Sequence, residues 1–115
     1  MYKRQPIALS AVDAADPAAR GKATVVRDGD SAIRLSLDGL APNSRGDAYE
    51  AWLMDGPERL VSLGSFRVGQ SGSATVTLPV PAAPGRYRFV DVSRERLDGD
   101  PGHSGTSVLR GPTRA

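Results

Sequence analysis

The sequence predicts an all-β fold in which antiparallel strands form a sandwich of two sheets. Apolar residues recur at every second position, turn-forming Gly, Pro, Asp or Ser residues bound each apolar segment, and no segment has the spacing of a long amphipathic helix. About seven to eight short strands at such intervals are typical of an immunoglobulin-like sandwich. A length of 115 residues suits one compact domain, so we expect residues 1–115 to form a single β-sandwich with flexible ends at 1–5 and 112–115.

Three strands are predicted in the first third of the chain. Their sequences are PIALSAV at 6–12, KATVVR at 22–27 and SAIRLSL at 31–37. The pair Asp28-Gly29 stands between the last two strands and is typical of a two-residue hairpin turn, because both of its positions need a positive φ. We therefore expect these two strands to pair with each other.

Five further strands are predicted between residue 47 and the C-terminus. They are DAYEAWLM at 47–54, RLVSLGSF at 59–66, SATVTLPV at 73–80, YRFVDVS at 87–93 and SVLRG at 107–111. The glycine-serine segment 69–73 lies between two of these strands and is predicted to be a hairpin loop. The last strand follows a long polar connection, and we expect it to be a weakly packed edge strand whose opening would expose a cleavable segment.

Aromatic residues indicate where the core lies. Trp52 is the only tryptophan and stands in the middle of the most apolar strand, which favours a core position; a place in a binding groove is the alternative. Tyr87 follows a Pro-Gly turn directly before an alternating strand, as in a tyrosine corner, in which the hydroxyl binds an upstream backbone group. Tyr49 follows a longer turn in the same way.

The residues needed for catalysis or metal binding are sparse. The chain has no cysteine and one histidine, so a Ser-His-Asp triad would have to use His103. Its neighbour Ser104 cannot readily face the imidazole ring, and GQSGS at 69–73 lacks the strand-to-helix turn of a nucleophile elbow. A calcium loop beginning at Asp98 fails because Leu109 stands where a bidentate glutamate is needed. We therefore expect no enzyme activity, no metal and no cofactor.

Charge and hydropathy bear on two classes of partner. The formal net charge is +2 and acidic residues are interspersed among the arginines, so the sequence has no basic stripe for nucleic acid. No apolar run approaches the ~18 to 20 residues of a membrane span, and the N-terminus lacks the apolar stretch of a signal peptide. We expect the chain to be soluble as written, or to be one domain of a longer, tethered protein.

The segment 90–111 is the most polar part of the chain. It contains the residues that we expect in a regulatory or binding loop, namely Arg94, Glu95, Arg96, Asp98, Asp100 and His103. We interpret the stretch from Arg94 to Gly105 as an exposed connection with an Arg–carboxylate pair at its base, not as an active site. The triplet Arg45-Gly46-Asp47 matches the integrin-recognition tripeptide, but a solvated turn before the next strand explains it equally well.

The order of these segments resembles the C-terminal extracytoplasmic domain of the anti-sigma-K factor family of the RskA type. The resemblance runs from Ala23 to Gly111 and is strongest in the strand Tyr49 to Leu53, followed by LVSLGSF, ATVTLPVP and YRFVDVSRE. It implies core or turn positions, none of them catalytic, for Tyr49, Trp52, Leu53, Gly64, Phe66 and Glu95. The expected structural core consists of Tyr49, Trp52, Leu53, Phe66, Tyr87 and Phe89.

The resemblance implies a sensory or protease-presenting domain of a membrane-anchored anti-sigma factor. In such proteins a cytoplasmic segment holds the sigma factor inactive, one helix crosses the membrane, and proteolysis releases the sigma factor. The expected partners are a site-specific protease and, through a cytoplasmic segment that this sequence lacks, the sigma factor. The expected location is the extracytoplasmic face of the membrane, and pairing of two copies into a homodimer stays open. The alternative is a secreted or surface-bound module that binds a protein or glycan through loops 44–47 or 97–105.

Overall fold

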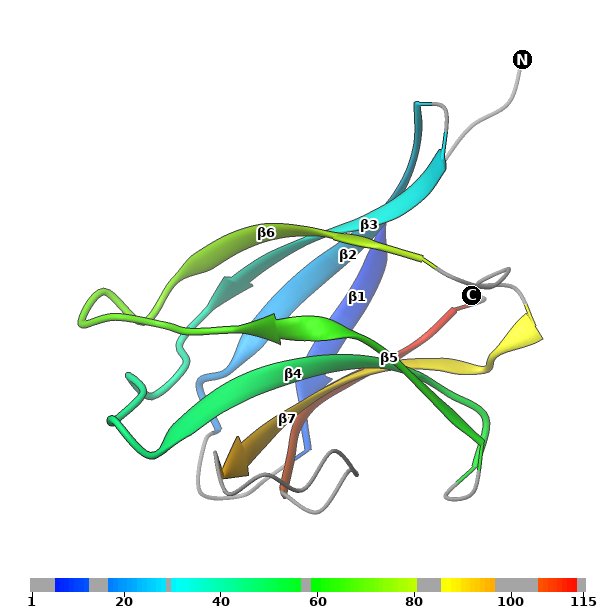
Figure 1. The fold of residues 1–115 in the computed structure, drawn as a ribbon. Coiled ribbons are helices and arrows are strands. Elements are labelled where there is room, and N and C mark those ends of the chain that lie inside the picture. The colour runs from blue at the N-terminus through cyan, green and yellow to red at the C-terminus, as the bar shows by residue number, and fades with distance from the viewer. Residues whose placement is uncertain are drawn as a thin grey trace.

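The computed structural model describes residues 6–12, 17–28, 30–56, 59–80, 86–96 and 106–113 (Figure 1). All regular elements in these ranges are β-strands, which confirms the predicted all-β class. Each of the eight predicted segments forms one strand. In chain order the strands are β1 (Ile7–Ala11), β2 (Arg20–Asp28), β3 (Asp30–Asp38), β4 (Asp47–Met54), β5 (Leu60–Phe66), β6 (Ala74–Pro79), β7 (Phe89–Arg96) and β8 (Thr106–Pro112).

The eight strands form one sheet in the order β5-β4-β7-β8-β1-β2-β3-β6, and all neighbours are antiparallel. The predicted hairpin is present, because β2 and β3 pair in register from Arg20↔Asp38 to Asp28↔Asp30. The sheet curls over, so that β2, β3 and β6 lie in one layer over β4, β5 and β7 in the other (Figure 1). The fold thus has two layers, but they are parts of one continuous sheet instead of the two separate sheets that we expected.

Pairing of the first strand with the last joins the two layers. β1 and β8 are in register around Ser10↔Arg110. Gly111 makes this close approach possible, because a Cβ atom there would lie 2.0 Å from the carbonyl oxygen of Ala8. The prediction that the last strand is an edge strand is therefore wrong, since β8 pairs with β7 on one side and with β1 on the other.

The two edges of the sheet are β5 and β6. They follow one another in sequence, yet among the described strands β5 pairs only with β4 and β6 only with β3. The prediction of a hairpin loop between them is therefore wrong: the chain turns at Gly69 and Gly72 while it crosses from one layer to the other. The two edges touch across the layers, because Leu78 Cδ2 lies 3.1 Å from where a Cβ atom of Gly64 would be.

The hydrophobic core lies between the layers, and alternation in β3 shows how it is built. Ile33, Leu35 and Leu37 are buried, whereas Arg34 and Ser36 point outward and are exposed. β4 and β7 differ from β3, because consecutive residues of both strands are buried. The outward faces of β4 and β7 are therefore covered, while the outward face of β3 is open to solvent.

Because all strands are antiparallel, every connection lies at one of two ends of the molecule. We call the end at which the chain enters β1 and leaves β8 the proximal end; it also has the β2–β3, β4–β5 and β6–β7 connections (Figure 1). The distal end has the four other connections. At the proximal end the Thr113 N–H donates to the Arg88 carbonyl at 2.8 Å, so residues 112–113 are held to the fold beyond the predicted start of the flexible tail.

Candidate functional site

At the distal end, one carboxylate ties the loop before β4 to β7. Asp47 accepts hydrogen bonds from Asn43 Nδ2 at 3.1 Å, from the Ser44 N–H at 2.9 Å and from Arg94 Nε at 2.7 Å. Arg94 also donates to the carbonyl of Pro42 at 3.1 Å. The predicted Arg–carboxylate pair at the base of the polar segment is thus made by Arg94 with Asp47 on a neighbouring strand.

These contacts shift the pKa of the Asp47 carboxyl group. Partial burial raises this pKa, but the hydrogen bonds from Arg94, Asn43 and Ser44, together with the charge of Arg94, outweigh burial and hold it below its usual range. The carboxylate is therefore ionised at neutral pH and occupied by internal partners. The Arg45-Gly46-Asp47 triplet consequently does not present a free carboxylate of the kind an integrin-type partner would bind.

The expected regulatory or binding loop begins later than the sequence indicates. Arg94, Glu95 and Arg96 belong to β7, whose pairing with β4 continues to the register pair Asp47↔Arg96. Glu95 is only 7% exposed, whereas Arg96 at the end of the strand is exposed. The interpretation of this stretch as an exposed connection is therefore wrong for Arg94 and Glu95, because both belong to β7, where Arg94 is half-buried and Glu95 is buried.

Three residues of the expected loop lie outside the described ranges. These are Asp98, Asp100 and His103, which follow β7 in the sequence. β7 ends and β8 begins at the distal end, so the connection that contains these three residues starts and finishes there.

The outward face of β7 has a buried polar cluster that the sequence analysis missed. Asp91 and Ser93 are both 0% exposed. Asp91 accepts hydrogen bonds from Arg110 Nε at 2.9 Å and from Ser107 Oγ at 3.1 Å, both on β8. Polar residues at every second position of a strand are typical of a solvent-facing surface, so the alternation in β7 predicts that Asp91 and Ser93 are exposed.

Ser93 extends this cluster toward β4. Its hydroxyl oxygen accepts a hydrogen bond from Trp52 Nε1 at 2.9 Å, and the hydroxyl donates to Glu95 Oε2. Trp52 is 4% exposed, but it lies on the outward face with the polar cluster and does not belong to the hydrophobic core between the layers. Trp52 is therefore buried, as expected for a core residue, but it packs with the polar cluster and not in an open binding groove.

Four other expected core residues, Tyr49, Leu53, Phe66 and Tyr87, do lie in the hydrophobic core. The rings of Tyr49 and Phe66 stack with centroids 5.8 Å apart. The Tyr49 hydroxyl donates to the carbonyl of Ala41 at 2.6 Å, which is the bond of a tyrosine corner. Of the two tyrosines considered for this motif, Tyr49 is the one that makes such a bond in the described structure.

The last expected core residue, Phe89, is half-buried at the edge of the polar cluster. The guanidinium carbon of Arg110 lies 6.0 Å from its ring centroid, so the arginine that pairs with Asp91 also covers this ring.

At the proximal end, another carboxylate binds two arginines. Asp55 accepts hydrogen bonds from Arg88 Nε at 2.7 Å and from Arg59 at 3.2 Å. The hydrogen bond from Arg88 is the main cause that lowers the pKa of the Asp55 carboxyl group, and the charges of both arginines add to it. Arg59 also lies over the Tyr87 ring, with its guanidinium carbon 4.8 Å from the centroid.

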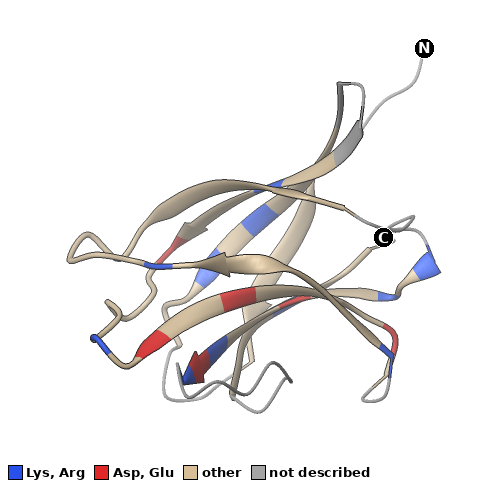
Figure 2. Cartoon of the chain, viewed as in Figure 1, with Lys and Arg blue, Asp and Glu red and all other residues tan. Residues whose placement is uncertain are grey.

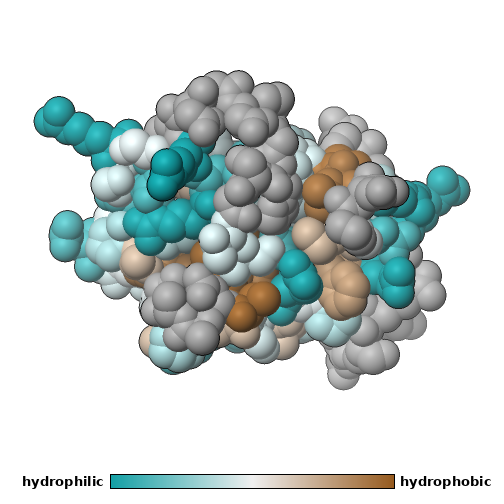
Figure 3. Space-filling view, turned by 90° about the horizontal axis from the view of Figure 1, so that it is seen from below, coloured by the Kyte–Doolittle hydropathy of each residue, from teal (hydrophilic) through white to brown (hydrophobic). Residues whose placement is uncertain are grey.

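The described ranges offer no metal centre and no large apolar patch. No group of three or more His, Cys, Asp or Glu side chains there could hold a metal ion. No helix in the same ranges is long and apolar enough to cross a membrane. Val12 is the one large hydrophobic side chain among them that is exposed, and Figure 3 shows small hydrophobic areas separated by hydrophilic ones.

Comparison with known proteins assigns the chain to a family of regulators. The family model described as anti-sigma-K factor RskA, C-terminal, matches residues 3–107. No curated protein and no solved structure matches the chain. The matched range contains all of β1 to β7 and the first residues of β8. The chain therefore belongs to the anti-sigma-K factor RskA C-terminal family, as its motifs indicate.

Proposed function

We propose that this chain is the extracytoplasmic sensory domain of a membrane-anchored anti-sigma factor, and that it controls release of a sigma factor by regulated proteolysis. Membership of the anti-sigma-K factor C-terminal family over residues 3–107 carries this proposal. On this proposal a cytoplasmic segment outside these 115 residues holds the sigma factor, and a membrane helix joins that segment to the domain. The domain itself catalyses no reaction and needs no cofactor.

The topology supports a tethered domain with an outward-facing surface. The chain enters β1 at the proximal end, and the β1–β2, β3–β4, β5–β6 and β7–β8 connections lie at the distal end. A tether before β1 would hold the proximal end toward the membrane. The distal connections would then be the part that a ligand or protein partner from outside reaches first.

Stability is the property through which such a domain could control a protease. Proteolysis of a folded domain follows the population of locally or globally opened forms. A ligand that binds only the folded form, at a hundredfold excess over its Kd, stabilises that form by about 2.7 kcal/mol. This free energy lowers the population of opened forms about a hundredfold, which would slow cleavage by a similar factor.

Opening is expected to begin at the edge strands. β5 and β6 each pair with one neighbour, whereas β8 pairs with two. An edge strand can separate from the sheet by losing one ladder of hydrogen bonds, while β8 must lose two. We therefore place the regulated element at β5 and β6 instead of at the last strand. Amide exchange in β5 and β6 that is as slow as in β4 and β7 would contradict this placement.

The native gene offers the first test of the proposal. We expect the reading frame upstream of residue 1 to encode an apolar span of about 20 residues, preceded by a helical cytoplasmic segment. A reading frame that starts at residue 1, or with a cleavable signal peptide, would contradict the proposal. It would favour the alternative, a secreted or surface-bound module that binds a protein or a glycan.

A second test uses the full-length protein in its host, with a reporter of sigma-dependent transcription. Arg110→Ala removes a partner of the buried Asp91, whereas Arg34→Ala removes an exposed arginine from β3. We expect the first variant to raise cleavage of the outer domain and reporter output without a stimulus, and the second to behave like the wild type. Unchanged cleavage in an Arg110→Ala protein that is measurably destabilised would show that stability does not control release.

A further inference from the structure

The two ends of the molecule differ in charge. Outside the strands, the proximal segments 1–6, 29, 55–59, 80–88 and 113–115 contain six basic and two acidic residues. The distal segments 12–19, 39–46, 67–73 and 97–105 contain two basic and four acidic residues. The acidic residues of the proximal segments are Asp55 and Glu58, while Asp28 and Asp30 are the strand residues that flank the β2–β3 turn. By sequence, the connecting segments at the end where the chain enters β1 therefore carry an excess of positive charge, and those at the opposite end an excess of negative charge. Figure 2 shows where the charged residues of the described ranges lie.

Three of the proximal basic residues lie in the described structure as exposed arginines. The side chains of Arg59 and Arg88 are 55% and 75% exposed, and each donates to Asp55 through one of its three nitrogen atoms. Arg86 is exposed too and has no hydrogen-bond or ion-pair partner within the described ranges. Together these three arginines and Asp55 leave a net positive charge on the surface.

Further basic residues stand in the sequence directly beside this end. Lys3 and Arg4 precede β1, and Arg114 follows the last described residue, Thr113. The arginines expose planar guanidinium groups, which bind phosphate oxygens through two parallel N–H donors. The chemistry of this end therefore suits a surface of closely spaced phosphate groups.

We propose that the proximal end binds the anionic phospholipid surface of the membrane to which the domain is tethered. This inference rests on the proposed function, because the tether before β1 is what brings this end to the bilayer. Each Lys or Arg near an anionic bilayer strengthens binding about fivefold, and the effect falls off within a Debye length of about 8 Å. The longest extent of the molecule is 44 Å, so the acidic distal end lies beyond the reach of the same surface charge.

Binding in this way would fix the orientation of the domain. The charge asymmetry favours contact through the proximal end alone, so the distal connections would be held away from the bilayer. The proximal β4–β5 and β6–β7 connections would lie against the headgroups, where an external protease reaches them less easily. Asp28 and Asp30, at the tip of the β2–β3 hairpin, oppose this contact and keep it reversible.

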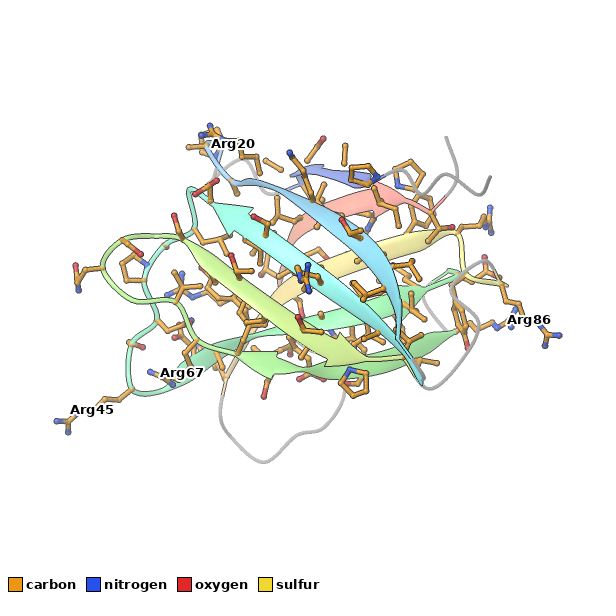
Figure 4. All side chains as sticks on the ribbon, turned by 90° about the horizontal axis from the view of Figure 1, so that it is seen from above. Arg20, Arg45, Arg67 and Arg86 are labelled. Carbon is orange, nitrogen blue, oxygen red and sulfur yellow. The ribbon has the colours of Figure 1, made fainter. Side chains whose placement is uncertain are left out.

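Sedimentation with lipid vesicles tests the proposal on the 115-residue chain. One set of vesicles contains equal parts of phosphatidylglycerol and phosphatidylcholine, and the other contains phosphatidylcholine alone. The proximal variant carries Arg86→Ser and Arg88→Ser, and the matched distal variant carries Arg20→Ser and Arg45→Ser. All four arginines are exposed. Figure 4 shows Arg86 at the opposite end of the molecule from Arg20 and Arg45. Arg67 is unsuitable as a control because its guanidinium donates to the carbonyls of Asp47 and Ser44.

We expect binding to the phosphatidylglycerol vesicles that weakens with added salt and is absent with phosphatidylcholine alone. The proximal variant should bind more weakly by about 25-fold, which is two steps of fivefold, and the distal variant by less than about twofold. Equal losses in the two variants, which have the same net charge, would overturn the proposal and leave only non-specific attraction. Binding to neither set of vesicles would overturn it as well.

The outcome separates this inference from the proposed function. Vesicle binding is measured without a sigma factor, a membrane helix or a protease. If the reading frame encodes the anchored anti-sigma factor but the wild-type chain ignores phosphatidylglycerol, the orientation by lipid fails and the proposed function stands. If no membrane helix is encoded, the proposed function fails whatever the vesicles show.

Discussion

β3 and β7 are both interior strands of the same sheet, but their outward faces have opposite environments. Arg34 and Ser36 of β3 are exposed, whereas Asp91 and Ser93 of β7 are fully buried. Both strands alternate between apolar and polar residues. The same alternation can therefore produce a solvated surface or a buried polar network, and the difference depends on the partners that the polar groups find on neighbouring strands.

The partners of the β7 residues explain why burial is tolerated there. A buried polar group destabilises a fold unless its hydrogen bonds are made. Asp91 finds Arg110 and Ser107 on β8, and Ser93 finds Trp52 on β4. Within the described ranges, no buried side-chain nitrogen or oxygen atom lacks a partner. Substitutions on the two outward faces should consequently differ in effect.

The largest difference is expected between two arginine variants. Arg110→Ala takes a charged partner from the buried Asp91 carboxylate and should lower the free energy of unfolding by about 3 kcal/mol. Arg34→Ala on the outward face of β3 should change it by less than about 0.5 kcal/mol. Urea unfolding of both proteins measures the two values. Similar small effects would mean that the cluster on β7 contributes no more to stability than an exposed surface does.

Two serine variants sharpen the same comparison with a smaller change. Ser93→Ala leaves the buried Trp52 N–H without its acceptor and should destabilise the protein by about 2 kcal/mol, whereas Ser36→Ala should stay within about 0.5 kcal/mol. In a Trp52→Phe background the indole N–H is gone, so Ser93→Ala should cost less than it does in the wild type. Equal costs in both backgrounds would show that the Trp52–Ser93 bond is not the source of the effect.

An inward-facing hydroxyl should matter less than the outward cluster. Tyr49→Phe removes the hydrogen bond to the Ala41 carbonyl but keeps the ring that stacks on Phe66. We expect a loss of about 1 kcal/mol in the free energy of unfolding, measured by the same urea titration. A loss larger than that of Ser93→Ala would reverse the ranking of the two sites.

The smallest effect is expected from the carboxylate at the distal end, and it depends on pH. The pKa of Asp47 is lowered in the folded state, so its contribution is full above the unfolded-state pKa of about 4 and is lost as the pH falls through the lower, folded value. Asp47→Asn should therefore cost less than about 1 kcal/mol at neutral pH and nothing in strong acid. Urea unfolding at neutral and acidic pH measures the difference, and an equal cost at both would exclude a charge effect.

The local parts of this fold are predictable from the sequence, and the non-local parts are not. Apolar residues at every second position locate all eight strands, and Asp28-Gly29 locates the β2–β3 hairpin. The pairing of β1 with β8, and the separation of β5 from β6, depend on contacts between segments that no local pattern connects. Strands that follow each other in sequence usually pair, and that tendency gives the wrong prediction for the glycine-serine segment 69–73.

The candidate site shows the same limit at the level of side chains. The sequence indicates an Arg–carboxylate pair near Arg94, and the structure supplies one with Asp47. The burial of Asp91 and Glu95 could not be predicted, because charged residues are rarely buried and nothing in the local sequence marks the partners that they find in the fold. The position of Trp52 on the outward face also depends on a partner from another strand, because its indole nitrogen donates to Ser93 on β7.

Pairing between the first strand and the last has a consequence for the time course of folding. β1 and β8 lie about 100 residues apart, so the ribosome must synthesise the whole stretch from β1 to β8 before the two layers can join. A chain that ends before Thr106 leaves β1 and β7 with unpaired edges, which is the state that cellular quality control degrades. β8 is thus the element that closes the sheet, and the joint between the two layers forms only after it is available.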